Sequence, residues 1–268
     1  MSQVDPAAGS AGGSAREEAA EHIDVTRNRV ARRSRVREVI FGTQDGLLAT
    51  LGLVVFFGGA FSDRYTVLIA GLAGAVAGLI AMGAGAYISS KSQLEVAVAE
   101  VARENRELAA NPERELEELV QLYEAEGLPE ADARIVAEKI AQRPLAMLNA
   151  MTQKELRLAI EANEPFKEGI VMALAFLVGA VVPIAPWAFA AISGGPVVAG
   201  LDLSPALLLS VGVTAGTLFV LGAGKARVAH NSMLRGGLEI MLIGIVAAVV
   251  GYVVGSYVPH LVGVRTGV

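Results

Sequence analysis

The chain has no cysteine and only three histidines among its 268 residues, and both shortages narrow the chemistry open to it. Without cysteine, disulfides, cysteine-ligated iron–sulfur clusters and thiolate metal sites are excluded. The histidines, His22, His230 and His260, all lie outside the most polar region of the chain, residues 91–168. A tight structural zinc site and a four-helix di-iron site normally use histidine ligands, so we expect neither there. A membrane ferroxidase is disfavoured for the same reason.

Charged residues are also scarce, at 18% of the chain, whereas 53% of the residues are hydrophobic and 30 are glycine. This balance is typical of a membrane protein that carries a soluble part. An α-helix needs about 20 mostly apolar residues to cross a bilayer. Five runs are long and apolar enough, at residues 36–61, 66–90, 167–192, 204–224 and 236–258. The sequence therefore predicts an all-α membrane protein with five transmembrane helices.

Positive charge beside the apolar runs predicts the orientation of the chain. Six arginines lie directly before the first run or at its very start, namely Arg27, Arg29, Arg32, Arg33, Arg35 and Arg37. Because positively charged flanks stay on the cytoplasmic side, we expect the N-terminus inside. The loop between the fourth and fifth runs holds Lys225, Arg227 and Arg235, whereas residues 193–203 hold only one charge, Asp202. Both loops agree with this orientation and place the C-terminus outside.

The arginine cluster has two interpretations, because such clusters also bind nucleic acids. This one contains no aromatic residue and directly adjoins a membrane span. We therefore expect lipid headgroups, and no nucleic acid, as its partner. The alanine- and arginine-rich composition with an acidic start favours the plasma membrane of a bacterium as the location.

Composition divides the chain into four regions. Residues 1–26 show no apolar periodicity, so we expect a disordered N-terminal tail. Residues 27–90 hold the arginine-rich segment and the first two spans, and residues 167–268 hold the last three. Between them, residues 91–166 form an acidic helical domain, with 17 acidic and 10 basic residues from Lys91 to Glu168. We place it in the cytoplasm because an even number of spans precedes it. Its first helix is expected to end at Asn111-Pro112, and further helices to cover residues 113–126, 130–142 and 144–161.

Beyond the charged residues at its very start, Arg37 and Glu38, the first apolar run contains one carboxylate, Asp45. An ionised Asp near the centre of a membrane helix costs on the order of 3 kcal/mol, so it usually marks an ion path, a proton relay or a buried pair. Met82 in the second, antiparallel run is expected at a similar depth, roughly 12 to 14 Å from the cytoplasmic end. A carboxylate oxygen beside a thioether sulfur suits a cation such as ferrous iron or manganese. Alternatively, Asp45 holds helices together through Thr43 or Gln44, and Met82 only fills space.

Paired glutamates in the acidic domain form a second candidate metal site. The pairs, three residues apart, are Glu104 with Glu107 and Glu115 with Glu118, and Glu100 lies four residues before the first of them. These spacings place side chains on one helix face, so the two pairs can converge across the turn between their helices. Crowded carboxylates repel each other unless a cation neutralises them. The alternative is an ordinary acidic face exposed to solvent.

Small residues recur at three- and four-residue spacing along several spans, as at Gly71, Gly74, Gly78 and Gly85, at Gly212 and Gly216, and at Gly251 and Gly255. Such spacing lets helix backbones approach closely, so it predicts either a homodimer or packing within the chain. In the third span Pro183 and Pro186 predict a kink, and Trp187 is expected to anchor the helix at the membrane interface. Glu239 begins the fifth span as either a proton site or part of an ion pair with a nearby cation.

Together these segments resemble the vacuolar iron transporter family over nearly all of the chain from about Arg35. The resemblance lies in FGTQDGLLATLGLV of the first span, MGAGAYISSKSQLE at the end of the second, the acidic helices, GAVVPIAP in the third, and GAGKA before a glycine-rich fifth span. It implies a dimer of five-span protomers that exports ferrous iron, and often manganese, from the cytoplasm in exchange for protons. The chain is then a transporter without a permanent cofactor, and not an enzyme.

The resemblance also implies roles for particular residues. In the family a first-span Asp and a second-span Met line the path at the dimer interface, and these match Asp45 and Met82. The family's cytoplasmic metal cluster consists of two Glu pairs and a Met-Met-x-x-Glu element, which fall on Glu104, Glu107, Glu115, Glu118, Met151, Thr152 and Glu155. With Glu100 added, these residues except Thr152 are the candidate metal ligands. Thr152 replaces a soft methionine ligand, and Ala86 stands where many relatives have a glutamate.

We therefore expect the acidic domain to collect divalent metal and to deliver it to Asp45 and Met82, where alternating access releases it outside. A carboxylate that binds either a metal ion or a proton couples the two fluxes. The alternative is a membrane-anchored iron-binding or sensing protein without transport. In that protein the paired glutamates are essential and Asp45 is dispensable.

Overall fold

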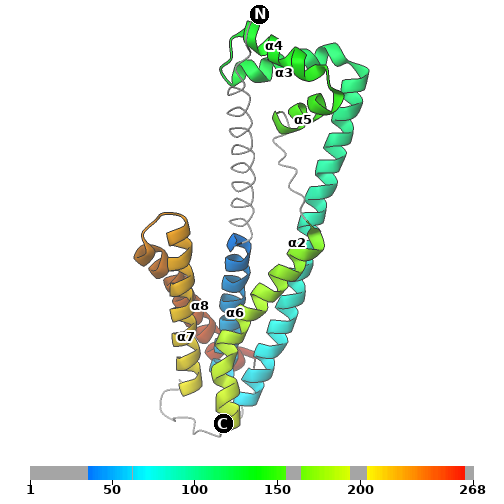
Figure 1. Ribbon diagram of the computed structural model, residues 1–268. Coiled ribbons are helices and arrows are strands. Elements are labelled where there is room, and N and C mark those ends of the chain that lie inside the picture. Colours follow the sequence, from blue (N-terminus) through cyan, green and yellow to red (C-terminus); the bar gives the residue numbers. More distant parts are fainter. Residues whose placement is uncertain (1–35, 62, 155–163, 194–203, 263–268) are drawn as a thin grey trace, which may run out of the picture. The chain divides into compact units, whose positions relative to one another are not determined.

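The structure is a computed structural model that describes residues 36–61, 63–154, 164–193 and 204–262, with only the backbone described at 190–193 and 259–262. Its elements, most of which are labelled in Figure 1, are the first span (Val36–Ala60), α2 (Arg64–Ala110), α3 (Pro112–Ala125), α4 (Glu130–Ala141), α5 (Pro144–Lys154), α6 (Pro165–Ser193), α7 (Pro205–Val228) and α8 (Met233–Val262). No strand occurs within these described stretches. The predicted all-α fold is confirmed.

Among the described residues, five helices are long and apolar enough to cross a membrane, namely the first span, α2, α6, α7 and α8. The predicted number of spans is therefore confirmed. The second of them, α2, has 47 residues. At about 1.5 Å per residue it is about 70 Å long, more than twice the roughly 30 Å of a bilayer's hydrocarbon core. Its C-terminal part therefore extends beyond the apolar layer.

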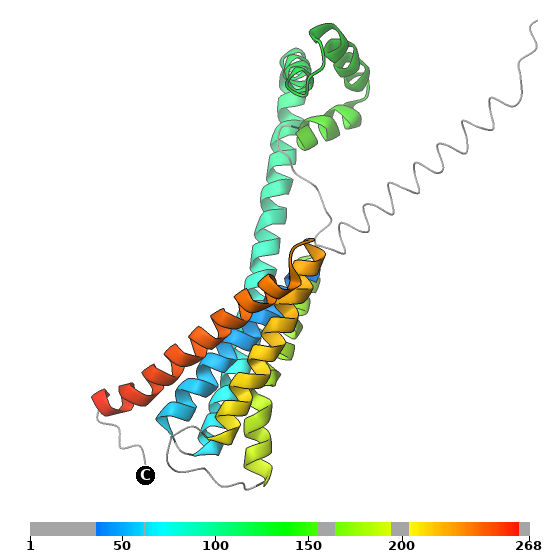
Figure 2. The ribbon, with the colours of Figure 1, turned by 90° about the vertical axis from the view of Figure 1, so that its left-hand side faces the viewer.

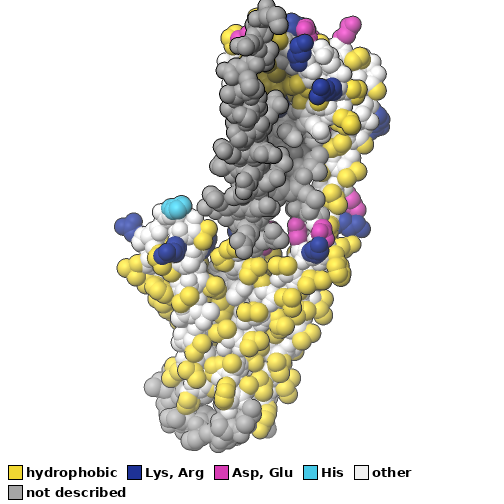
Figure 3. Space-filling view, viewed as in Figure 1, with side chains coloured by type: hydrophobic (Ala, Val, Ile, Leu, Met, Phe, Trp, Pro, Cys, Tyr) yellow, Lys and Arg dark blue, Asp and Glu magenta, His cyan; other side chains and the backbone are white. Residues whose placement is uncertain are grey.

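The chain forms two compact units, and α2 contributes to both. The membrane unit comprises the described residues up to Gly83 and from Ile170 onwards, and the acidic unit comprises Ala84–Gly169. In the space-filling view, apolar side chains cover most of the described surface of the membrane unit, whereas charged side chains are frequent over the acidic unit (Figure 3). This difference in surface chemistry is the one that the composition predicts.

The first span packs closely against two other helices of the membrane unit. A Cβ atom at Gly46 would collide with the carbonyl oxygen of Phe176 in α6, and one at Gly179 would collide with the carbonyl oxygen of Thr43. A Cβ atom at Gly255 of α8 would likewise meet the carbonyl oxygen of Phe56. The glycines therefore permit contacts between backbones. The first span is the helix around which the apolar core of this unit is built.

Glycines of α2 pack within the chain. Positions for a Cβ atom at Gly71, Gly74 and Gly78 fall against Val54, Leu53 and Phe176, respectively. Packing within the chain thus accounts for these three residues. At Gly85, Gly212 and Gly216, by contrast, no described atom of another helix lies within 4 Å of the corresponding position.

Two helices of the membrane unit, α7 and α8, form a hairpin in which they run side by side (Figure 2). Gly222 of α7 faces Gly236 of α8 so closely that neither position has room for a Cβ atom. The turn between them is closed by His230, which has a positive φ of 57°. The amide of Asn231 donates to the carbonyl of Ala226 at 2.8 Å, as in a helix that ends with a left-handed residue.

The prediction for Trp187 was wrong. Its side chain is only 4% exposed and belongs to the apolar core cluster of the membrane unit, where it packs against Gly58 of the first span and Leu207 of α7. An interfacial anchor would need to be exposed to the headgroup region. Trp187 is buried because its indole ring fills the space beside Gly58, which has no side chain.

The helix ends that the structure describes in the acidic unit agree with the sequence, whereas the predicted end of its last helix at residue 161 lies outside the described residues. Asn111 separates α2 from α3, and Pro112 occupies the first turn of α3. Gly127 follows α3 with a φ of 100°, and its amide and that of Leu128 donate to the carbonyls of Glu124 and Tyr123. This is the Schellman arrangement that glycine favours after a helix. The core of the unit consists of Leu119, Val120, Ala133, Ala137, Met147 and Met151.

Candidate metal sites

The paired glutamates flank the turn between α2 and α3. Glu104 and Glu107 lie in the last turns of α2, and Glu115 and Glu118 lie in the first turns of α3. Carboxylates are favourable near the N-terminus of a helix because the unpaired amides there carry partial positive charge. Local helix chemistry therefore favours the second pair independently of any metal.

Burial differs sharply between the members of each pair. Glu104 and Glu115 are 0% exposed, whereas the side chains of Glu107 and Glu118 are 37% and 41% exposed. One oxygen of Glu115, Oε1, is bonded to Arg114, and the other, Oε2, has no hydrogen-bond partner among the described residues. An ionised carboxylate is unfavourable in a buried position unless a positive charge compensates it. The buried Glu104 and Glu115 therefore indicate that a cation, either a side chain or a metal ion, is needed nearby.

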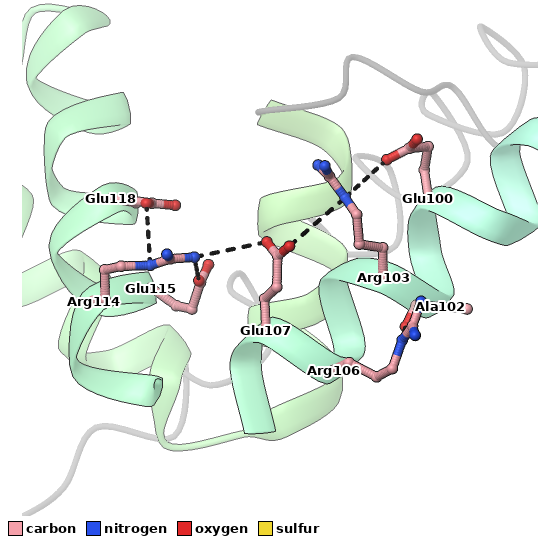
Figure 4. Close-up of polar contacts among 8 residues, drawn as sticks. All are labelled: Glu100, Ala102, Arg103, Arg106, Glu107, Arg114, Glu115 and Glu118. Carbon is pink, nitrogen blue, oxygen red and sulfur yellow. Dashed lines mark hydrogen bonds and ion pairs between the residues drawn. The ribbon is translucent and has the colours of Figure 1, made fainter. Parts of the chain in front are cut away.

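Arg114 supplies positive charge to this cluster. Its Nη2 atom lies 2.7 Å from Oε1 of Glu115 and 3.7 Å from Oε2 of Glu107, and its Nε atom lies 3.5 Å from Oε1 of Glu118. Figure 4 shows the guanidinium between these three carboxylates, two of α3 and one of α2. The hydrogen bond to Glu115, followed by the charge of Glu118, raises the pKa of Arg114 above its usual value. The guanidinium therefore remains charged.

A second arginine, Arg103, forms ion pairs with two glutamates of its own helix, α2. Nε of Arg103 lies 3.2 Å from Oε2 of Glu100 and 3.8 Å from Oε1 of Glu107 (Figure 4). Glu107 is thus shared between two arginines, whereas Glu100 pairs along its own helix. Neither arginine was predicted to take part in the glutamate cluster. The spacing was informative, because Arg114 lies four residues before Glu118 and can pair with it.

The structure brings Glu107, Glu115 and Glu118 together around Arg114. In the parts of the chain that it describes, no three histidine, aspartate or glutamate side chains are arranged so that they could hold a metal ion as they stand. The guanidinium of Arg114 lies between the three carboxylates, which gives a physical reason why they do not converge on one point. The ligand roles of these glutamates, and those of Glu104 and Glu100, stay predictions.

The later element of the predicted cluster is only partly described. Met151 and Thr152 of α5 are buried at 0% and 1% exposure, and Met151 belongs to the apolar core of the acidic unit. The hydroxyl of Thr152 has no hydrogen-bond partner among the described residues. Glu155 lies outside the described residues.

The residues predicted for the transport path lie in the membrane unit. Asp45 is half-buried in the first span and forms neither a hydrogen bond nor an ion pair with any described residue. The alternative role, a hydrogen bond through Thr43 or Gln44, therefore receives no support. Met82 of α2 is partly buried and packs against the apolar core cluster. That these two side chains lie at one depth stays a prediction.

Glu239 has no ion-pair partner in the described part of the chain. It lies on α8, two turns from the helix start, and is exposed in the protomer. Lys225 and Arg235, the cations considered as partners, form no ion pair with it. The interpretation of Glu239 as part of an ion pair therefore receives no support from the described residues. Its role as a proton site stays a prediction.

Known proteins similar to the chain agree with the features described above. The model of the VIT family matches residues 36–256. The chain is 31% identical over 220 residues to vacuolar iron transporter 1 of Oryza sativa subsp. japonica. The aligned residues cover 81% of this chain and 82% of the rice protein. It is 29% identical over 228 residues to vacuolar iron transporter 1 of Arabidopsis thaliana, with 84% and 86% covered. It is 30% identical over 231 residues to the vacuolar iron transporter of Toxoplasma gondii, with 85% and 76% covered.

The family match thus spans all five apolar helices and the acidic unit between the second and the third. The identity is moderate, but it extends over most of both chains in each comparison. The expected resemblance is confirmed by these matches, and the chain belongs to the VIT family, the family of the vacuolar iron transporters.

Proposed function

We propose that this protein moves divalent transition metal, ferrous iron and also manganese, out of the cytoplasm across a membrane in exchange for protons. The observation that carries the proposal is the state of Asp45, a carboxylate inside a membrane helix without a cationic partner among the described residues. The names of the relatives in rice and Arabidopsis support iron as the cargo. The bacterial plasma membrane remains a prediction.

An unpaired carboxylate within a span requires a physical explanation. Ionised Asp near the middle of a membrane helix costs on the order of 3 kcal/mol, and a structural role would require partners that Asp45 lacks in the described residues. A divalent ion or a proton that binds there neutralises the charge. Because both compete for the same oxygens, metal leaves as a proton arrives, and the two fluxes are coupled.

Met82 is the second ligand that we propose for the path. Its thioether sulfur is a soft donor, and a site of carboxylate and thioether suits ferrous iron or manganese better than magnesium or calcium. Met82 is only partly buried, so it is not locked into the core. This leaves its sulfur free to turn toward a passing ion.

A second copy of the chain is the partner that we propose for α2. Its apolar window is only 17% buried within the protomer, the lowest value of the five spans. Ile69, Leu72, Val76 and Ile80 are exposed along it. Lipid can cover such a face, but the exposed Ala73 and Ala77 on it are small enough to allow close helix pairing. The path at Asp45 and Met82 would then be completed by the dimer.

The acidic unit is proposed to lie in the cytoplasm and to collect metal before transport. Two buried glutamates and two half-exposed ones provide oxygen ligands on adjacent helices. Transport can be measured as uptake of ferrous iron or manganese into inverted membrane vesicles with an imposed pH gradient. We expect Asp45→Ala to abolish uptake and Asp45→Asn, which keeps the shape but loses the charge, to do the same.

The matched control is Asp132→Ala, which removes an exposed carboxylate of α4 and should leave uptake unchanged. Undiminished uptake in both Asp45 variants would end the proposed mechanism. A second candidate function, metal binding or sensing without transport, is favoured by the complete burial of Glu104 and Glu115. In that case substitution of the glutamates removes function while Asp45→Asn has no effect.

A further inference from the structure

We propose that Arg114 is a built-in competitor for metal in the acidic unit, and that its guanidinium must leave the carboxylates of Glu107, Glu115 and Glu118 before a divalent cation can bind them. The inference rests on the proposed function, in which these glutamates take part in metal binding. It adds a residue that sets the metal affinity without being a ligand.

The guanidinium of Arg114 occupies the position that a bound metal ion would need. The guanidinium lies between the three carboxylates, with its closest contact, 2.7 Å, to Oε1 of Glu115 (Figure 4). A cation bound by the same carboxylates would need the oxygens that now face Nη2 and Nε. Metal and guanidinium therefore cannot both occupy this position.

One oxygen of the cluster is left unsatisfied while the guanidinium is in place. Oε2 of Glu115 is buried and has no hydrogen-bond partner in the described part of the chain. A metal ion that replaces the guanidinium would supply positive charge to both oxygens of Glu115. Repulsion between the approaching cation and the guanidinium favours departure of the guanidinium, because the side chain of Arg114 is 55% exposed whereas that of Glu115 is buried.

The guanidinium can also leave the cluster without crossing the core of the unit, because the side chain of Arg114 is 55% exposed. Its ion pairs with the half-exposed Glu107 and Glu118 contribute little to stability, because water and salt screen them. The pair with the buried Glu115 is the stronger one, and a bound metal ion would replace the positive charge that Glu115 loses. Metal should therefore still bind.

Lysine cannot reproduce the arrangement. The guanidinium uses Nη2 and Nε to contact carboxylates of both α2 and α3 at once, whereas an ammonium group is a single point charge. Removing the guanidinium should thus strengthen metal binding, and replacing it by lysine should strengthen binding less. A purely structural arginine would behave in the opposite way, since its loss would weaken the site.

The test is a titration of the full-length protein in detergent with Mn²⁺, in which free Mn²⁺ is measured by its room-temperature electron paramagnetic resonance signal. All variants carry Asp45→Asn so that the membrane unit does not contribute. We expect R114Q to lower the Kd about three- to tenfold, the range expected when a few weak ion pairs are lost. R114K should lie between R114Q and the parent.

The matched control is R134Q. Arg134 makes a two-pronged contact of 2.7 and 2.9 Å with Glu117, on the same helix as Glu115 and Glu118 but apart from the cluster. Its Kd should stay within about twofold of the parent. Equal or weaker Mn²⁺ binding by R114Q would overturn the inference, provided that its circular dichroism and thermal unfolding match those of the parent. If R114Q does not fold, R114K decides, and equal or weaker binding by that variant overturns the inference.

The variant E115Q separates this inference from the proposed function. If E115Q loses Mn²⁺ binding and R114Q binds as the parent does, the cluster holds metal and only the role of Arg114 is wrong. If E115Q binds Mn²⁺ as the parent does, the cluster is not the site, and both the inference and the proposed role of the acidic unit fall.

Discussion

The hydroxyl of Ser210 in α7 donates a hydrogen bond of 2.7 Å to the carbonyl oxygen of Pro183 in α6, and both residues are buried. Proline removes a backbone donor from a helix, so the backbone around it is satisfied less well by its own helix. A polar bond between helices away from water is a direct link between two spans. This bond ties the proline-containing part of α6 to its neighbour.

We predict that Ser210→Ala destabilises the membrane unit by about 1 kcal/mol, the usual contribution of such a bond between membrane helices. The measurement is thermal unfolding followed by the fluorescence of Trp187, the only tryptophan of the chain, which lies in the core cluster that also contains Leu207 of α7. The control is Thr217→Ala, because the Thr217 hydroxyl bonds only to Val213 of its own helix, at 2.8 Å. Equal effects of the two substitutions would contradict the prediction.

Close backbone packing makes a second prediction about the membrane unit. Gly46→Ala should destabilise the membrane unit by about 1 to 3 kcal/mol, the usual cost of overpacking. The new methyl group would meet a backbone carbonyl of α6, which cannot rotate away as a side chain could. Gly212→Ala is the matched control, since no described atom of another helix lies within 4 Å of the position of its new methyl group. The readout is the midpoint of thermal unfolding and the yield of folded protein in detergent. A stable Gly46→Ala variant would mean that the first span and α6 are packed differently.

Much of the fold could be predicted because membrane spans and helix ends depend on local sequence. Apolar runs of sufficient length indicated all five spans. Asn111-Pro112 and Gly127 indicated helix ends. At Gly127 the reason is its φ of 100°, which glycine adopts more readily than other residues. The change of composition near Lys91 marks a change of surroundings, but it does not end the helix. Backbone hydrogen bonds of α2 continue to Ala110, because the same helix can present an apolar surface and then a polar one.

The parts that could not be predicted depend on tertiary contacts. Trp187 resembles an interfacial anchor by its position in the sequence, but Gly58 on another helix leaves room that buries it. Arg114 looks like one more charge on an acidic helix until the fold places Glu107 of α2 beside it. Which glutamate of each pair is buried also depends on how α2, α3 and α5 pack, and spacing alone treats both members alike.

The contact between α3 and α4 predicts a dependence on pH. The guanidinium of Arg134 donates two hydrogen bonds to Glu117, and this lowers the pKa of Glu117 below its ordinary value of about 4.3. Since the pKa is lower in the folded protein, the stabilisation is present above about pH 4.3 and is lost as the pH falls through the folded value. R134Q should therefore unfold at a lower temperature than wild type at pH 7, and the difference should shrink as the pH falls and Glu117 becomes protonated in the folded protein.

The measurement is the difference in unfolding temperature between wild type and R134Q at a series of pH values. Lys139→Gln is the control, because Lys139 lies exposed on the same helix and forms no ion pair among the described residues. That variant should show no pH-dependent difference from wild type. A constant difference between R134Q and wild type across the whole range would show that the arginine acts through packing and not through the charge of Glu117.

The buried hydroxyl of Thr152 makes the last prediction. A buried polar group without a hydrogen bond costs about 1 to 3 kcal/mol, and valine has nearly the same shape without the hydroxyl. We therefore expect Thr152→Val to stabilise the acidic unit by about 1 kcal/mol. Thr152→Ser keeps the hydroxyl and removes a buried methyl group, so it should destabilise the unit by a similar amount. Hydrogen exchange of the α5 amides, followed by mass spectrometry in the full-length protein, measures both effects. If Thr152→Val loosens α5, the hydroxyl has a partner in solution, and a repeat of the exchange experiment with added Mn²⁺ would show whether that partner is the metal.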